Sequence, residues 1–260
     1  MAPIVKEVWE IDLMRQAGRI VAQGLKLLAE HVRPGVTTAE LDALYERHVR
    51  ESGAVPTFKG YRGFPASICV SINEEVVHGI PSPRRVLKEG DIVSLDAGAT
   101  YKGYVGDAAV TLPVGKISPA ARRLIDTTRE ALEEAIKLVA PGVGLSKIAA
   151  TIQRYAESRG YSVVKKFVGH GIGRQMHEEP QVPNYVDGLP LEQFEYILKP
   201  GICIAIEPML NEGTDDVRTL KDNWTVVTRD RKLSAHFEHT VAVTEKGHEV
   251  LTRLEDPGRA

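Results

Sequence analysis

The chain has 260 residues, of which 43% are hydrophobic and 26% charged, a balance typical of globular proteins and unlike that of disordered chains. Its 33 basic and 35 acidic residues give a formal net charge of −2, which excludes a strongly basic field for nonspecific nucleic-acid binding. No apolar run approaches the roughly 18 residues of a membrane span, and no basic-then-apolar signal pattern opens the chain. Its two cysteines, Cys69 and Cys203, lie in apolar runs. We therefore expect a cytoplasmic protein with free, buried thiols.

The first half of the sequence predicts two helices followed by strands. Apolar residues recur at three- and four-residue spacing over 4–33, and Pro34-Gly35 ends this helix. Thr37 and Glu40 form a capping-box signal for a second helix that runs to about Ser52. Strands are expected over 66–72, 91–96 and 101–112, after a loop-rich stretch over 57–64.

The second half of the sequence repeats this order. One helix is expected over 119–139, where Pro141-Gly142 ends it, and a second helix then runs to about Ser158. Strands are expected over 202–207 and 237–243, with a hairpin arm over 224–233. The segment Val32–Val36 matches Val139–Val143 around a shared Pro-Gly, which by itself could be a chance similarity of two helix ends. An acid at the same place in both following strands, Asp96 and Glu207, favours a duplicated unit instead. We expect one domain, 1–260, with pseudo-symmetric halves of about 1–115 and 116–255.

Four acids on the predicted strands lie on the face that carries small residues. They are Asp96, Asp107, Glu207 and Glu238. Side chains two apart share a face of a strand, and the residue two positions from each acid is serine, alanine or threonine. A buried charge costs several kcal/mol unless it is paired or bound to metal. Salt bridges to arginine are the alternative, but these strands carry no arginine, and Lys102 lies at the turn that leads into one of them.

Two divalent cations would balance the four carboxylates. Such ions lie about 3.5–4 Å apart when carboxylates bridge them. The ligand set is rich in oxygen, and with a histidine added it favours manganese, iron, cobalt or zinc over a thiolate site.

Three of the eight histidines lie in glycine-containing segments between the acid-bearing strands. His170 lies within Gly169–Arg174, His78 precedes Gly79, and His177 precedes Pro180. Each could be structural when taken alone, but this setting favours a functional role. His236 and His239 flank Glu238, and we expect both to point to the other face of the strand or to act only behind the ligands.

Other catalytic motifs do not fit. The segment GHGIGR superficially resembles a dinucleotide loop, but Pro180 breaks any long helix after it. The same proline excludes the zinc motif HExxH, and no GxSxG elbow for a serine nucleophile is present.

Five segments together closely resemble the type I methionine aminopeptidases: ASICVSINEEVVHGIPS, GHGIGRQMHEEPQVPN, IEPML, DNWTVVTRD and SAHFEHTVAVTEKG. The similarity extends in order from about Ile11 to Leu251. It implies the pita-bread α/β (α+β) fold, in which a pseudo-twofold antiparallel sheet is flanked by helices. It also implies removal of the N-terminal methionine from peptides and nascent chains, with a small second residue preferred.

The resemblance also implies the roles of individual residues. The metal ligands would be Asp96, Asp107, His170, Glu207 and Glu238, with Asp107 and Glu238 bridging two ions. Glu207 would also be the general base that activates water, and His78 and His177 would contact the substrate peptide and stabilise the developing oxyanion. The pocket for the methionine side chain would be Tyr61, Phe64, Cys69, Met176 and Trp224.

Two positions depart from the family pattern. Met176 replaces a common phenylalanine, and Asp107-Ala108-Ala109 replaces a more common Asp-Thr-Ser. The resemblance further implies a monomer, a transient contact with the ribosome, and a backbone-carbonyl site for a monovalent cation near Asn73 and Ser234. It implies no specific nucleic-acid or membrane partner.

Two alternatives stay open. An X-prolyl aminopeptidase or prolidase would use the same fold on X-Pro peptides. A catalytically inactive protein of the same fold would bind RNA or ribosomes, but it should have lost ligands and gained basic segments.

Overall fold

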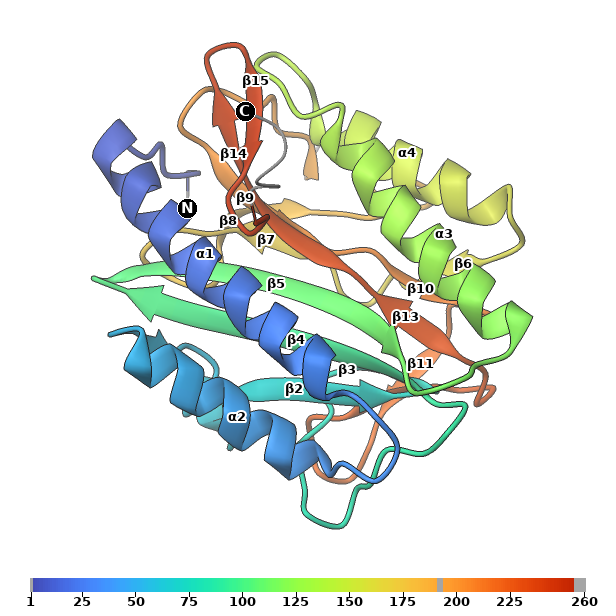
Figure 1. Ribbon diagram of the computed structural model, residues 1–260. Helices are drawn as coiled ribbons and strands as arrows, with labels where there is room; N and C mark the ends of the chain where they lie inside the picture. The colour runs from blue at the N-terminus through green and yellow to red at the C-terminus, as the bar shows by residue number, and fades with distance from the viewer. Residues whose placement is uncertain (1, 191–193, 255–260) are drawn as a thin grey trace.

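All four α-helices of the described chain lie on one face of a curved antiparallel sheet (Figure 1). The computed structural model describes residues 2–190 and 194–254. The helices are α1 (Val8–His31), α2 (Thr38–Glu51), α3 (Pro119–Ile136) and α4 (Leu145–Glu157), with a short 3₁₀ turn at Tyr61–Gly63. No helix in these ranges is both long and apolar enough to cross a bilayer.

The main sheet has nine strands. Its central order is β1-β4-β5-β14-β9-β7-β8, with β2 also paired to β4 and β15 to β14. These strands are β1 (Val55–Pro56), β2 (Ile68–Ile72), β4 (Ile92–Tyr101), β5 (Tyr104–Pro113), β7 (Gly169–Gly171), β8 (Glu178–Val182), β9 (Cys203–Ile206), β14 (Glu238–Thr244) and β15 (Gly247–Val250).

Two smaller antiparallel sheets accompany the main one. They have the orders β13-β10-β6 and β11-β12-β3. Their strands are β3 (Glu75–Val77), β6 (Ser162–Val163), β10 (Met209–Asn211), β11 (Val217–Thr219), β12 (Val226–Thr228) and β13 (Ser234–His236). The pita-bread architecture expected from the sequence, antiparallel strands flanked by helices, is confirmed.

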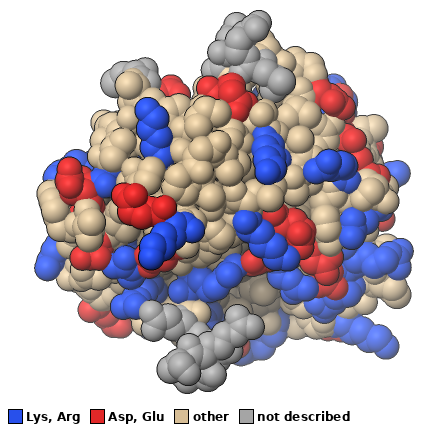
Figure 2. Space-filling model, turned by 90° about the horizontal axis from the view of Figure 1, so that it is seen from above, with Lys and Arg blue, Asp and Glu red and all other residues tan. Residues whose placement is uncertain are grey.

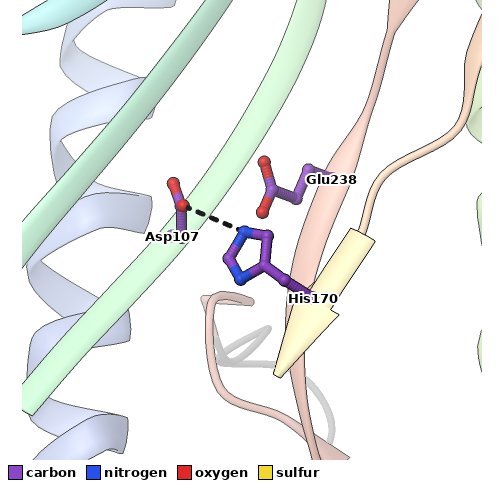
Figure 3. Close-up of side chains that lie close together, drawn as sticks. All are labelled: Asp107, His170 and Glu238. Carbon is purple, nitrogen blue, oxygen red and sulfur yellow. Dashed lines mark ion pairs between the residues drawn. The ribbon is translucent and has the colours of Figure 1, made fainter. Parts of the chain in front are cut away.

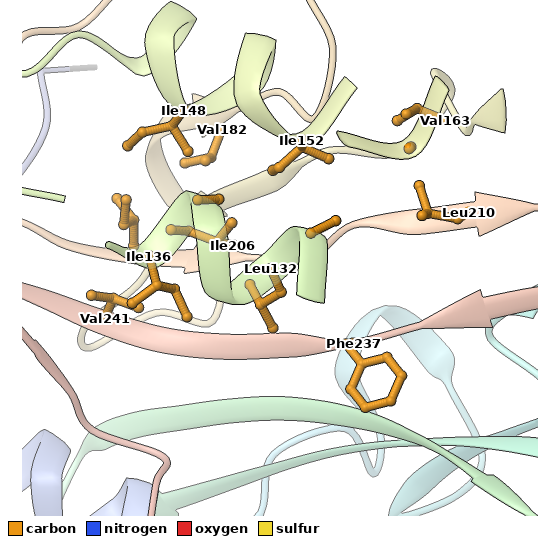
Figure 4. Close-up of a cluster of buried hydrophobic side chains, with 14 of the residues drawn as sticks. Leu132, Ile136, Ile148, Ile152, Val163, Val182, Ile206, Leu210, Phe237 and Val241 are labelled. Carbon is orange, nitrogen blue, oxygen red and sulfur yellow. The ribbon is translucent and has the colours of Figure 1, made fainter. Parts of the chain in front are cut away.

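Each half of the chain supplies one helix pair and the strands beneath it. Helices α1 and α2 share an apolar cluster with β4 and β5 that includes Leu25, Leu41 and Leu95. Helices α3 and α4 share the second cluster with β9 and β14, in which Ile136, Ile152 and Val241 are fully buried (Figure 4). The large apolar side chains of these two clusters therefore face the helices, and the alternate residues of the same strands face away.

Helix α1 packs against the backbone of β5 at a pair of glycines. A Cβ atom on Gly106 would lie 2.6 Å from the Gly18 nitrogen, and one on Gly18 would lie 2.3 Å from the Leu251 carbonyl oxygen. Only glycine permits this approach. The contact fixes the strand that carries Asp107 directly beneath the helix.

The element boundaries follow the sequence with small corrections. The second helix has the expected capping box, in which Thr37 and Glu40 bond each other's backbone N–H groups. The first helix begins at Val8, later than expected, because the preceding segment is extended. The hairpin arm expected over 224–233 is instead formed by β11 and β12, with its turn closed by Leu220 N–H donating to Thr225 O at 2.8 Å. The arm had been placed too late because Trp224 belongs to the turn.

Basic and acidic side chains are interspersed over the face shown in Figure 2. That distribution agrees with the net charge of −2. The face therefore presents no continuous field of one sign, of the kind that binds nucleic acid nonspecifically.

A buried ion pair anchors the segment before α1 to the start of β8. Lys6 Nζ lies 2.7 Å from Glu178 Oε2, and the two side chains are only 3% and 5% exposed. Lys6 N–H also donates to Gly201 O at 2.8 Å, and Glu178 Oε1 accepts from Gln175 N–H at 3.1 Å. The pair thus supports the turn that carries Met176 and His177.

Lys6→Met should destabilise the protein by about 3–5 kcal/mol, because it leaves the buried Glu178 carboxylate without a positively charged partner. The free energy of unfolding, measured by urea denaturation, tests this. The double variant Lys6→Met/Glu178→Leu should recover most of the loss. Lys137→Met is the matched control, since the Lys137–Glu134 pair is exposed at 66% and 42%, and its loss should leave the free energy of unfolding nearly unchanged. Equal losses in both single variants would contradict the structural role of the Lys6 pair.

Candidate active site

A cavity of about 250 Å³ opens on the face of the sheet opposite the helices. Every residue that the sequence singled out for the site lines it, namely Tyr61, Phe64, Cys69, His78, Asp96, Asp107, His170, Met176, His177, Glu207, Trp224 and Glu238. The alternation of the strands causes this arrangement: Leu95 and Ala97 pack on the helix side, so Asp96 points to the other side.

The four acids come from four neighbouring strands. Asp96 in β4 and Glu238 in β14 both lie opposite Ala109 of β5, two residues from Asp107. Glu207 directly follows β9, which pairs with β14 on its other side. The register of the sheet, and not any local sequence motif, therefore brings the carboxylates together.

His170 faces the carboxylates with one ring nitrogen free. Its Nε2 lies 3.6 Å from Glu207 Oε1 and 3.9 Å from Asp107 Oδ2. Its Nδ1 lies 2.9 Å from Gly171 O, which fixes the proton on Nδ1 and leaves Nε2 as an acceptor. Asp107, His170 and Glu238 offer ligand atoms that all lie within 4.8 Å of one another (Figure 3).

The carboxylates have no basic side chain to neutralise them. In residues 2–190 and 194–254, no lysine or arginine forms an ion pair with any of the four acids, whose nearest cationic candidates are histidines. One oxygen each of Asp96, Asp107 and Glu238 is buried without a hydrogen-bond partner. The expectation against arginine salt bridges is thus confirmed, and these open oxygen positions fit a divalent cation.

Burial of like charges changes the pKa values of the site. Burial raises the pKa of Asp96 to about 7, and burial together with neighbouring carboxylates raises those of Asp107, Glu207 and Glu238 well above their ordinary values. Burial lowers the pKa of His170 to about 3, with a further contribution from His177. At neutral pH, therefore, the imidazole is neutral, as a metal ligand must be.

His236 lines the cavity. The expectation that its side chain points to the other face of the strand was wrong. Its Nε2 lies 3.9 Å from Glu207 Oε2 and 4.0 Å from Glu238 Oε2, and the ring is buried. Thr111 Oγ1 bonds both the N–H and the C=O of His236, at 2.9 and 2.8 Å. A residue two positions before Glu238 shares its face, so the alternation rule itself predicts this placement. His239 does lie on the other face, with Nδ1 2.9 Å from Thr252 Oγ1.

His78 and His177 flank the acids. The His177 ring lies beside that of His170, with centroids 4.2 Å apart and the planes tilted by 43°, and its Nδ1 lies 2.8 Å from the Tyr61 hydroxyl oxygen. His78 has a positive φ of 60° and packs edge-on against Phe167 and Trp224. Burial lowers the pKa of both rings to about 4, so both are neutral at pH 7.

An apolar pocket adjoins the acids. Phe64, Cys69 and the partly buried Met176 and Trp224 belong to one cluster, in which Phe64 and Trp224 meet edge-on at 5.1 Å. Burial, reinforced by the charge of Asp96, raises the pKa of the Cys69 thiol well above its ordinary value, so this residue lines the wall as a neutral group. Both cysteines are free and buried, as expected.

Sequence reasoning missed several lining residues. Phe58 and Arg62 lie in the stretch interpreted only as a loop, and Phe167 precedes the glycine-rich segment. Their proximity to Tyr61 and His170 in the sequence was the available signal.

The comparisons with known proteins agree with this geometry. The family model described as Metallopeptidase family M24 matches residues 12–245. Methionine aminopeptidase 1 of Bacillus subtilis is 52% identical over 251 residues, 96% of this chain and 99% of the relative. The methionine aminopeptidase of Escherichia coli is 45% identical over 257 residues, 98% of this chain and 96% of the relative.

Solved structures of methionine aminopeptidases are also similar to this chain. The crystal structure of methionine aminopeptidase from Thermotoga maritima superposes with a TM-score of 0.93 and 44% identity, covering 97% of this chain and all of that one. Prolidase from Pyrococcus furiosus shares the fold at a TM-score of 0.75, but only 23% of its residues are identical and 66% of its length is covered. The chain therefore belongs to the Metallopeptidase family M24 and, within it, to the methionine aminopeptidases.

Proposed function

We propose that this protein removes the N-terminal methionine from peptides and nascent chains, preferring a small second residue, by attack of an activated water on the first peptide bond. The observation that carries the proposal is the convergence of five ligand-type side chains, unpaired by any lysine or arginine of the described chain, beside an apolar pocket. Relatives at 45–52% identity carry the name methionine aminopeptidase over nearly their whole length.

Asp96, Asp107, His170, Glu207 and Glu238 would hold two divalent cations, with Asp107 and Glu238 bridging them. The partnerless oxygens of Asp96, Asp107 and Glu238 fit this role. The mixed oxygen and imidazole set suits cobalt, manganese, iron or zinc. When bound, such a pair lowers the pKa of a water between its members and polarises the substrate carbonyl.

Glu207 would accept the proton of the attacking water. Its carboxylate lies within 4 Å of both His170 and His236, beside the space where that water must lie. A positioned base of this kind typically contributes 10²–10⁴-fold to the rate.

His177 and His78 would bind the reacting peptide group. Tyr61 Oη and His177 Nδ1 lie 2.8 Å apart, so in the tautomer with its proton on Nε2 the ring accepts from the Tyr61 hydroxyl and would donate from Nε2–H to the carbonyl oxygen. A donor that meets developing negative charge contributes most strongly in the transition state, and losing one typically costs about 10²–10³ in rate.

The methionine side chain would enter the pocket of Tyr61, Phe64, Cys69, Met176 and Trp224. Thioether sulfur packs well against aromatic edges, and Phe64 and Trp224 offer them. Met176, itself flexible, would let this wall adapt to the substrate.

The remaining expectations stand as parts of the proposal. The chain would act as a single catalytic domain, because strands from both halves supply acids to one cavity. It would be a cytoplasmic monomer with transient ribosome contact and no specific nucleic-acid or membrane partner. A monovalent cation would bind near Asn73 and Ser234.

Hydrolysis assays distinguish the proposal from its alternatives. The metal-loaded protein should release methionine from Met-Gly-Met and Met-Ala-Ser, and a chelator should abolish the release. An X-prolyl enzyme would instead cleave Ala-Pro peptides, and an inactive binding protein would cleave neither. Preference for Ala-Pro over Met-Ala peptides would refute the proposal.

Glu207→Gln should lower kcat by about 10²-fold or more, because the amide cannot accept the proton of water. Bound metal, measured by elemental analysis, should remain substantial, since the amide oxygen is still a ligand. The exposed substitution Glu134→Gln serves as the control and should leave kcat unchanged. Near wild-type turnover in the Glu207 variant would remove the residue from the role of base.

Metal removal should lower the melting temperature by about 5–10 °C at pH 8, and by less at pH 6.5. The metal-free folded protein retains protons on acids with raised pKa values, up to about 7 for Asp96. The unfolded chain releases those protons near pH 4, so the metal-free fold loses stability as pH rises towards and through 7. Bound cations replace these protons. Calorimetry with and without chelator measures the difference in melting temperature between the metal-loaded and metal-free protein. A difference that becomes smaller as pH rises would contradict this account.

A further inference from the structure

The opening of the cavity lies beside one arginine. Of the residues that line the cavity, only Arg62 and His177 are exposed, while the acids and the apolar pocket lie deeper. In the proposed function the methionine side chain and the reacting peptide group occupy that deeper part. The third and later residues of a substrate must therefore leave the cavity past Arg62 and His177.

The turn before β2 holds Arg62 in this place. Arg62 has φ 49° and ψ 24°, between Gly60 at φ 87° and Gly63 at φ 88°. Gly60 N–H donates to Phe64 O at 2.8 Å, and Gly63 N–H donates to Gly60 O at 3.1 Å. A left-handed conformation is unfavourable for a non-glycine residue, and such strain persists where the surrounding structure enforces it.

The guanidinium group remains available to a ligand. Its carbon lies 5.3 Å from the centre of the Tyr61 ring, whose hydroxyl contacts His177. Arg62 is the only lysine or arginine in the lining, and it forms no ion pair within the described ranges, unlike Lys59 nearby, which lies 2.6 Å from Glu46.

Arg62 is the only permanently charged cation among the described residues that line the cavity. Its charge therefore acts on whatever part of the substrate passes the opening.

We propose that Arg62 makes the enzyme select substrates with a carboxylate just beyond the second residue. That carboxylate is either an acidic side chain at the third or fourth position or the C-terminal group of a short peptide. The inference rests on the proposed function and adds a substrate class to it. An exposed charge pair contributes up to about 1 kcal/mol, which corresponds to about a fivefold change in kcat/KM.

The test compares C-terminally amidated peptides of the series Met-Ala-Xaa-Gly and Met-Ala-Gly-Xaa, with Xaa aspartate, asparagine or lysine. The wild-type, metal-loaded enzyme should favour aspartate over lysine by about three- to tenfold in at least one series, mainly through KM. Arg62→Gln should bring that ratio close to one, and Arg62→Glu should invert it. Added salt should reduce the wild-type ratio.

Free-acid and amidated Met-Ala-Gly separate the two sources of carboxylate. A preference for the free acid that Arg62→Gln removes assigns the contact to the C-terminal group, and a ratio that changes only with Xaa assigns it to side chains. Arg123→Gln, an exposed arginine of α3 with the same change in charge, should keep the wild-type ratios.

Each ratio is internal to one variant, so a partly folded preparation does not affect it. An unchanged set of ratios in Arg62→Glu overturns the inference, whereas failure of the wild type on Met-Ala-Asn-Gly refutes the proposed function instead.

Discussion

The burial of four carboxylates in one cavity is the constraint on which the rest of the structure depends. Like charges at such short range raise one another's pKa values, and each buried oxygen without a partner costs free energy. A fold retains such a cluster only where something positive compensates it. Since the described chain offers no lysine or arginine for that purpose, a divalent cation is the partner that fits, as membership of a metallopeptidase family requires.

The fold tolerates the free-energy cost of burying the carboxylates because one face of the sheet packs against the helices and the other face lines the cavity. Residues such as Leu95 and Val241 bury their side chains under the helices and supply the hydrophobic free energy. The alternate positions are then free to carry acids and small residues. Close backbone contact at Gly106 keeps α1 tight against β5, so the strand that carries Asp107 is held rigidly.

The histidines of the cavity are uncharged at neutral pH. His170 and His236 approach the acids without adding protons at neutral pH, and His177 remains an uncharged hydrogen-bonding group near the opening. The turn that carries Met176 and His177 is supported from behind by the buried Lys6–Glu178 pair. Among the described residues that line the cavity, the one permanent positive charge is therefore at the mouth, in Arg62, and none lies at the floor.

The sequence by itself determined the elements that follow from local physical rules. The helix periodicity, the capping box of Thr37 and Glu40, and the acids on the small-residue faces of strands were all predictable, because propensity and alternation act over a few residues. The family motifs extended this to the architecture. The error at His236 was an error in applying alternation, since its position two residues before Glu238 already indicated the shared face.

Only the tertiary structure decided how these pieces meet. Asp96 reaches Ala109 through the local β4–β5 hairpin, but Glu238 faces the same Ala109 through pairing between β5 and β14, which lie more than 100 residues apart in the chain. Sequence spacing does not encode that second register. The exposure of Arg62 at the opening, the pairing of Lys6 with Glu178, and the neutral state of the histidines are likewise decided by burial. Burial is a property of the whole packed chain, which is why no local pattern of residues could reveal it.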